Sequence, residues 1–331
     1  MCVRNIYKQV IIICSGVTMN KLFGILFVLI VSVSACPQQS VYFDPNAGAV
    51  LQDLSFDTPK VYDDDTVSLM FDVVNVGGKE ITDSINVYIY GPTIENSSST
   101  TEVWRLTESQ PEVDPTDGYI EYSLTSADLP APDPSLGTPG GQKPFEYTFK
   151  PATVLDGVEI PTTFYVSLCY PYSTQTLTQI EVTSKNEMRA TGVQSSRKDT
   201  VNAGGPIHLT LLGSSGIRPG KIPLVFKVTD VGGGYSSLNT SCKVDLPKVN
   251  RSKVNISVSV DGNTSAKCGS GTTNTAIVRL KNGVGTVYCT FQPPATVAPR
   301  RTYIVSATAT YMYYTTSTVG VTNIGSTIET S

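Results

Sequence analysis

Charged residues, histidine, tryptophan and long apolar stretches are all scarce in this chain of 331 residues, and each scarcity narrows the possible chemistry. Only 16% of the residues are charged, and there is one histidine, His208, and one tryptophan, Trp104. A single histidine leaves few partners for a zinc site or a histidine-based triad. The sequence has no Cys-X-X-Cys pair, Gly-X-Ser-X-Gly elbow, His-Glu-X-X-His helix or phosphate loop. We therefore expect no enzyme, with no catalytic residues, no metal site and no cofactor.

The one long apolar run lies near the start of the chain, where Met19-Asn20-Lys21 precedes Leu22–Ala35. A positive start, an apolar middle and small final residues predict a secretory signal peptide over residues 1–35, with Met19 as the true start. The run of about 14 residues is shorter than the roughly 20 that a membrane-spanning helix needs. A start at Met1 would instead join two apolar stretches into an uncleaved anchor.

The segment Val33-Ser34-Ala35-Cys36 resembles the lipobox of prokaryotic lipoproteins. That resemblance implies that the Cys36 thiol is lipidated and becomes the first mature residue. We therefore expect an exported protein on the outer face of the cell membrane or at the cell surface, with the membrane as a partner through the lipid anchor.

The mature part of the chain is mildly acidic. Residues 1–35 hold three of the 24 basic residues and none of the 28 acidic ones, so the remainder has a formal net charge of −7. Such a body lacks the clustered Lys and Arg that neutralise phosphates, and we expect no nucleic-acid partner. Abundant Thr, Ser, Val, Tyr and Gly favour β-sheet.

An internal repeat dominates the mature sequence. Val67–Pro92 aligns without a gap on Ile222–Pro247, and Tyr147–Val154 aligns on Cys289–Val297 with one inserted proline. Phe164-Tyr165-Val166-Ser167 then resembles Tyr303-Ile304-Val305-Ser306. Matching blocks in the same order indicate two copies of one unit.

Each block has the pattern of a strand. Leu69, Phe71 and Val73 alternate with other residues, as do their counterparts in the second copy, so one face of each strand is expected to be buried. Gly77-Gly78 and Gly232-Gly233-Gly234 then end the strands. About seven such strands per copy predict antiparallel β-sandwiches, with helix confined to the signal peptide.

The predicted boundaries follow from these blocks. We expect a tether at 36–46, a first sandwich at 47–183 and a linker at 184–205, followed by a second sandwich at 206–331. The first copy has a long polar insertion at 95–143, which contains Trp104 and is expected to be a loop. Binding functions tend to lie on such loops, although a loop without a role is equally compatible with the sequence.

The segment from Phe71 to Gly78, repeated from Phe226 to Gly233 with Asp230 in place of Asn75, carries a resemblance. It resembles the immunoglobulin-like CARDB modules of prokaryotic surface lipoproteins, and uncharacterised archaeal exported proteins built from tandem domains of this kind. The resemblance implies two tandem immunoglobulin-like sandwiches that act as spacers or binding platforms. It transfers no active site.

Besides Cys36, four of the seven cysteines lie in the mature part of the chain, which allows two disulfides in an oxidising compartment. We favour Cys268–Cys289, because a hairpin would return the second strand beside the loop of the first cysteine. Cys242–Cys289 is the alternative, since the repeat aligns Cys242 with Val87 and predicts that it faces the core. Cys169 and the remaining thiol are then buried free cysteines.

Other polar and aromatic features allow two interpretations each. Five Asn-X-Ser/Thr triplets are possible glycan acceptors, at Asn96, Asn239, Asn250, Asn255 and Asn263. Asp63-Asp64-Asp65 suits a calcium site or a solvated turn, and the strand position of His208 suits a solvent-facing residue. Tyr170-Pro171-Tyr172 and Tyr311–Tyr314 suit a sugar-binding or partner-binding face, or simply a filled sheet surface.

Together these features predict a non-enzymatic surface protein that displays β-sandwiches for adhesion or for interaction with a protein or glycan partner. A structural subunit of an envelope layer or surface filament, assembled through strand edges, is the alternative.

Overall fold

The computed structural model describes residues 43–81, 83–96, 103–113, 115, 117–192, 196–197, 200–212, 221–238, 241–244, 246–269, 271–293 and 300–326. These residues belong to one compact unit and are built mainly of β-strands, which confirms the all-β prediction. The predicted signal peptide and Cys36 lie outside the described residues. Within the described ranges, no helix has the length and apolar character of a membrane span.

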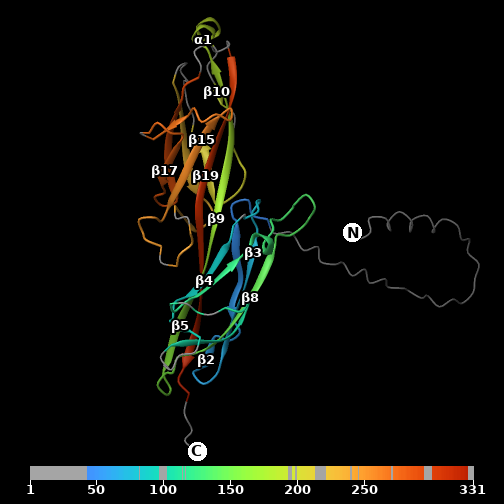
Figure 1. The fold of residues 1–331 in the computed structure, drawn as a ribbon, viewed down its shortest axis with the longest axis vertical. Helices are drawn as coiled ribbons and strands as arrows, with labels where there is room; N and C mark the ends of the chain where they lie inside the picture. Colours follow the sequence, from blue (N-terminus) through green and yellow to red (C-terminus); the bar gives the residue numbers. More distant parts are fainter. Residues whose placement is uncertain are drawn as a thin grey trace, which may run out of the picture. The chain divides into compact units, whose positions relative to one another are not determined.

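The strands form three sheets (Figure 1). The first has the order β1 (Ala49–Phe56), β3 (Val67–Asn75), β8 (Gln142–Lys150), β6 (Trp104–Gln110) and β5 (Ile94–Glu95). The second has the order β12 (Ile207–Leu211), β13 (Ile222–Asp230), β18 (Val284–Phe291) and β16 (Lys267–Cys268). The third and largest has the path β17 (Thr275–Arg279), β15 (Lys253–Val260), β19 (Arg300–Ile324), β9 (Glu159–Thr183), β4 (Ile85–Tyr90) and β7 (Ile120–Leu124). Four short strands pair beside this path, namely β2 (Lys60–Tyr62), β10 (Ser196–Arg197), β11 (Val201–Asn202) and β14 (Tyr235–Ser237).

The pairing of the strands follows the sequence repeat. In the first copy β3 pairs with β1 and β8, and in the second copy β13 pairs with β12 and β18. Phe149 lies opposite Val67, and Phe291 lies opposite Ile222, which are the positions that the repeat equates. The predicted alternation is also present, because every second side chain of β3 and of the first part of β13 is buried.

Both copies end this strand with the same turn. The Asn75 side chain accepts a hydrogen bond from the Gly77 amide at 3.1 Å, and Asp230 accepts one from the Gly232 amide at 3.2 Å. A side chain that bonds the backbone two residues on replaces a ladder bond and turns the chain. A Cβ atom at Gly77 would lie 2.5 Å from a carbonyl oxygen of Ala47, so the close approach of the backbone requires glycine there.

The gapless alignment is wrong beyond this turn. It equates β4 with residues around Cys242, but Cys242 lies in an irregular segment, and the second-copy strand that pairs as β4 does is β15. The predicted match of Cys242 with Val87 therefore fails. The second copy has additional residues between β13 and β15, including the short strand β14, and an ungapped alignment does not detect an insertion of this kind.

The first copy and the second copy share one pair of long strands. β9 and β19 each contain 25 residues and pair antiparallel from Arg300↔Thr183 to Ile324↔Glu159 without a register shift (Figure 1). At about 3.3 Å per residue each strand is about 80 Å long. Early residues of β9 pair with β4 of the first copy, whereas early residues of β19 pair with β15 of the second copy. The end of β19 then pairs with β2 of the first copy, so we call β9 and β19 the shared ladder.

Four buried tyrosines lie at the middle of the shared ladder: Tyr170, Tyr172, Tyr311 and Tyr313. Their neighbouring ring centroids are 6.0–6.3 Å apart. The repeat that equates Phe164 with Tyr303 also equates Tyr172 with Tyr311, and these two residues face each other across the ladder. Because β9 and β19 are antiparallel, the two copies therefore extend in opposite directions along the ladder from this point. A single contiguous core includes residues from both copies.

One short helix corrects the expectation that the mature chain has none. Helix α1 (Lys185–Thr191) begins after Ser184, whose side chain accepts a hydrogen bond from the Glu187 amide, and it ends at Gly192 in the left-handed conformation. A serine followed three residues later by glutamate is the signature of a helix start. The segment predicted as a linker thus contains α1, β10 and β11, and both short strands pair with β9.

The insertion at 95–143 is not a loop. It contains β6, which pairs with β8, and β7, which pairs with β4, together with a short 3-10 helix at Ser126–Asp128. Trp104 is only 4% exposed and begins β6. The second copy has β16 and β17 at the corresponding places, so these strands are part of the repeated unit.

Candidate functional site

Two disulfides cross-link the described part of the chain. Cys268 and Cys289 lie opposite each other on β16 and β18 and are bonded, which is the pairing favoured from the sequence. The second disulfide joins Cys169 on β9 to Cys242, with Cα atoms 5.7 Å apart. This second bond overturns the expectation of a free Cys169, and it holds a segment of the second copy against the shared ladder.

A small second core surrounds the Cys169–Cys242 disulfide. It lies on the face of the ladder opposite the main core and consists of Tyr88, Cys169, Leu246, Met312 and Tyr314. Alternation explains the division, because Tyr311 and Tyr313 belong to the main core while their neighbours belong to the second one. Tyr170 and Tyr172 also lie in the main core, so the predicted aromatic face is largely buried filling.

The hydroxyl groups of the central tyrosines are partly paired. Tyr313 donates to an Asp230 carboxylate oxygen at 2.7 Å and accepts from the Gly234 amide at 2.8 Å. Burial raises the pKa of Asp230 above its ordinary value, although the hydrogen bond from Tyr313 opposes this shift. The Tyr172 hydroxyl is buried without a hydrogen-bond partner among the described residues, and burial raises its pKa to about 12.

The possible glycan acceptors differ in accessibility. Asn96, Asn255 and Asn263 are exposed, Asn250 is half-buried, and Asn239 lies outside the described residues. Asn255 lies on β15 and points away from the main core, opposite Thr310 and Ile277 in the register. All five remain predictions as glycan acceptors, and the three exposed ones are the most accessible of those that the structure describes.

The first aspartate of the acidic turn, Asp63, forms hydrogen bonds with distant parts of the chain. Asp63 accepts hydrogen bonds from the Val154 amide and from the Ser326 amide and hydroxyl. Burial alone would raise the pKa of Asp63, but these bonds outweigh it and hold the pKa below the usual value. Within the described ranges no group of three His, Cys, Asp or Glu residues has the arrangement of a metal site. The aspartate instead ties the end of β19 to the first copy.

His208 is half-buried rather than fully solvent-facing. Its Nε2 atom is buried without a partner, and burial lowers its pKa, against the opposing effect of a hydrogen bond to the Gly205 backbone. β12, which carries it, is the outer strand of the four-stranded sheet. The imidazole therefore lies partly inside the sheet edge and does not project fully into solvent.

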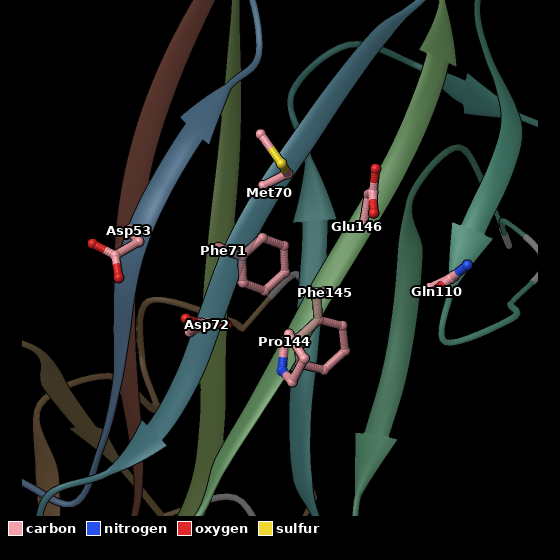
Figure 2. Close-up of a pocket in the computed structure, with 8 residues that line it drawn as sticks. All are labelled: Asp53, Met70, Phe71, Asp72, Gln110, Pro144, Phe145 and Glu146. Atoms are coloured by element: carbon pink, nitrogen blue, oxygen red, sulfur yellow. The ribbon is translucent and has the colours of Figure 1, made fainter.

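A hollow of about 370 Å³ lies on the outer face of the first sheet (Figure 2). Its lining comes from β1, β3, β6 and β8: Asp53, Met70, Phe71, Asp72, Gln110, Pro144, Phe145 and Glu146. The rings of Phe71 and Phe145 stack at 5.0 Å beneath it and belong to the main core. Bulges in β1 and β6 interrupt the sheet on either side, so the surface is recessed between them.

Three carboxylates give this hollow its electrostatic character: Asp53, Asp72 and Glu146. Asp72 accepts a hydrogen bond from the Gln142 side chain at 2.7 Å. Among the described residues, none of the three carboxylates forms an ion pair. Met70 is 38% exposed and adds a flexible apolar surface between them. The hollow therefore favours a basic side chain with an apolar stem, such as lysine or arginine.

Sequence reasoning did not detect this hollow. Its three acids occupy outward positions of three strands, β1, β3 and β8, and in the sequence each one is typical of an ordinary solvent-facing strand position. Met70 and Glu146 are far apart in the sequence, and they lie beside each other because β3 pairs with β8 in this register.

No protein-family model and no curated protein matches the sequence.

Proposed function

We propose that the chain is a lipid-anchored, non-enzymatic surface protein that holds a rigid pair of fused β-sandwiches outside the membrane for adhesion or protein interaction. Cys36 carries the lipid, and residues 37–46 connect it to the sandwiches. The two disulfides indicate an oxidising, exported environment.

The observation that carries the proposal is the uninterrupted shared ladder. Two separate sandwiches on a flexible linker would move independently, whereas 25 paired residues on each of two strands couple both copies into one stiff unit. A stiff unit on a short tether presents its surfaces within a limited distance of its anchor. The acidic hollow of Asp53, Asp72 and Glu146 is the surface that we assign to a basic partner.

The decisive experiment determines the mature N-terminus and its location in the native host. We expect mass spectrometry to find Cys36 first and acylated, and protease added to intact cells to cleave the protein. Cys36→Ser should release the protein from membranes, while Ser40→Ala, a matched change four residues on, should leave it attached. An unprocessed cytosolic chain, or a membrane-bound Cys36→Ser variant, contradicts the proposal.

A structural subunit of an envelope layer or filament is the second candidate, and one observation favours it. β17 is an edge strand of the ten-stranded sheet and exposes 65% of Ile277. Exposed edge strands pair readily with other chains. If this candidate holds, purified envelopes contain ordered polymers of the protein, and the Ile277→Lys substitution disrupts them. Dispersed particles from both the unsubstituted protein and the Ile277→Lys variant favour display.

A further inference from the structure

A second hollow, of about 510 Å³, lies at one end of the second copy. It opens where β15 ends, β18 ends and β19 begins, at Val260, Phe291 and Tyr303. These three residues are almost fully buried and form its floor, while exposed polar residues form its rim. Because the chain is built from a repeat, the first copy shows what the equivalent place contains.

The two copies share the same aromatic pair at this end. Phe149 and Phe164 of the first copy have ring centroids 5.2 Å apart. The repeat equates them with Phe291 and Tyr303 of the second copy, whose ring centroids are 5.1 Å apart. The framework around the hollow is therefore conserved between the copies, and the difference lies in what covers the pair.

An indole ring covers the pair in the first copy. Trp104 packs edge-on against Phe164, with centroids 5.0 Å apart and planes at 86°, and it is 4% exposed. Extending the β6–β8 register by one residue sets Trp104 against Pro151. Continuing the β16–β18 register for three residues before Lys267, where the chain is no longer in a strand, sets Thr264 against Pro293, the proline that the repeat equates with Pro151. A small threonine thus takes the place of the indole.

We propose that this hollow receives an aromatic side chain, tryptophan above all, from a partner protein. The ring enters beside Thr264 and packs against Tyr303 as Trp104 packs against Phe164. An aromatic ring fits because the floor is apolar and presents a pair of rings like the pair that an indole packs against in the first copy.

The rim adds groups that suit an aromatic guest. The Arg301 guanidinium carbon lies 4.7 Å from the centroid of the Tyr303 ring and is half-exposed, so it can cover a second ring from above. The Gln292 side-chain oxygen on the rim provides an acceptor for an indole N–H, whereas the Asp261 carboxylate is already paired with Arg301 and accepts from the Ile304 amide. The Tyr303 hydroxyl is buried at the floor and has no hydrogen-bond partner among the described residues.

The test uses the full mature chain with its disulfides intact and N-acetyl-L-tryptophanamide as the probe. We expect saturable binding of one probe per chain in calorimetry, with a dissociation constant on the order of 1 mM. N-acetyl-L-leucinamide and glucose should bind at least about tenfold more weakly, since a tenfold difference needs only about 1.4 kcal/mol of selective packing.

The matched variants distinguish the hollow from the rest of the surface. Thr264→Trp fills the hollow from within, as Trp104 fills its counterpart, and should abolish probe binding while keeping the melting temperature. Thr318→Trp adds the same side chain on an exposed position of β19 and should leave binding unchanged. If Thr264→Trp does not fold, Thr264→Met fills the same space with a flexible side chain and should weaken binding at least about threefold.

Three results would overturn the proposal: no saturation by the tryptophan probe, equal or tighter binding of glucose, or unchanged probe affinity in folded Thr264 variants. The inference rests on the proposed function only in placing the partner at the cell surface. A cytosolic, unlipidated chain would refute surface display and leave the affinity for the indole probe as it is, so the two failures are distinguishable.

Discussion

The turn that ends β3 and β13 allows a test within one molecule, because one copy uses Asn75 where the other uses Asp230. Exchanging them, as Asn75→Asp and Asp230→Asn, changes each side chain by one atom and keeps the acceptor that forms the turn. We expect the two substitutions to have opposite effects on the free energy of unfolding.

The magnitudes follow from the partners of each side chain. Asn75 is fully buried, and its amide donates to carbonyl oxygens of Leu129 at 3.0 Å and Lys79 at 3.5 Å. An aspartate there loses both donated bonds and buries a charge against two acceptors, which costs about 3 kcal/mol or more. In Asp230→Asn the remaining oxygen still accepts from Gly232 and Tyr313. We expect a change within about 1 kcal/mol of zero, on the stabilising side.

The pH dependence gives the second half of this prediction. Because the pKa of Asp230 is raised in the folded state, protonation of this group favours folding. Its stabilising contribution is present below the unfolded-state value of about 4 and is lost as the pH rises through the folded-state pKa. The gain in stability from Asp230→Asn should therefore be larger at neutral pH than at about pH 4.

Urea unfolding of the oxidised protein, followed by circular dichroism and by the fluorescence of Trp104, measures both variants at the two pH values. A native-like spectrum of each variant before unfolding is the control. Equal destabilisation by the two exchanges, or a pH-independent effect of Asp230→Asn, would refute the reasoning about the buried turn.

Three further predictions concern the cross-link, the histidine and the central tyrosines. Replacing Cys169 and Cys242 together by alanine should lower stability by about 4 kcal/mol in the loop-entropy estimate, and an unchanged urea midpoint would contradict it. Because the pKa of His208 is lowered in the folded state, its contribution to stability is present above about pH 6.5 and is lost as the pH falls through the folded-state pKa. The melting temperature of the His208→Gln variant should therefore depend less on pH in that range. Tyr313→Phe should lower the free energy of unfolding by about 1–3 kcal/mol because two hydrogen bonds are lost, whereas Tyr172→Phe should leave it unchanged. A larger loss for Tyr172→Phe than for Tyr313→Phe in urea unfolding would contradict these assignments.

Local patterns account for what the sequence determined by itself. Period-two alternation in β3 and β13 and the glycine-rich turns behind them are properties of a few consecutive residues, and they established the all-β class. The repeat equated residues that lie at the same places in the paired strands. The Cys268–Cys289 bond could also be predicted from the sequence, because only about twenty residues separate the two cysteines and a single hairpin brings them together.

Longer-range features were decided only by the tertiary structure. The insertion at 95–143 contains β6 and β7, whose alternating residues become strands because partners elsewhere in the chain offer them hydrogen bonds. The Cys169–Cys242 bond depends on a segment outside any strand packing on the far face of the ladder. Both hollows likewise exist only where separate strands meet.

The sharing of β9 and β19 is the clearest case. The sequence assigns one late strand to each copy, and nothing in either stretch states that the two strands pair with each other along their whole length. That pairing depends on register between residues more than a hundred positions apart, which no local pattern specifies. Sequence periodicity thus determined that the strands exist, and the tertiary structure decided that they join two copies into one body.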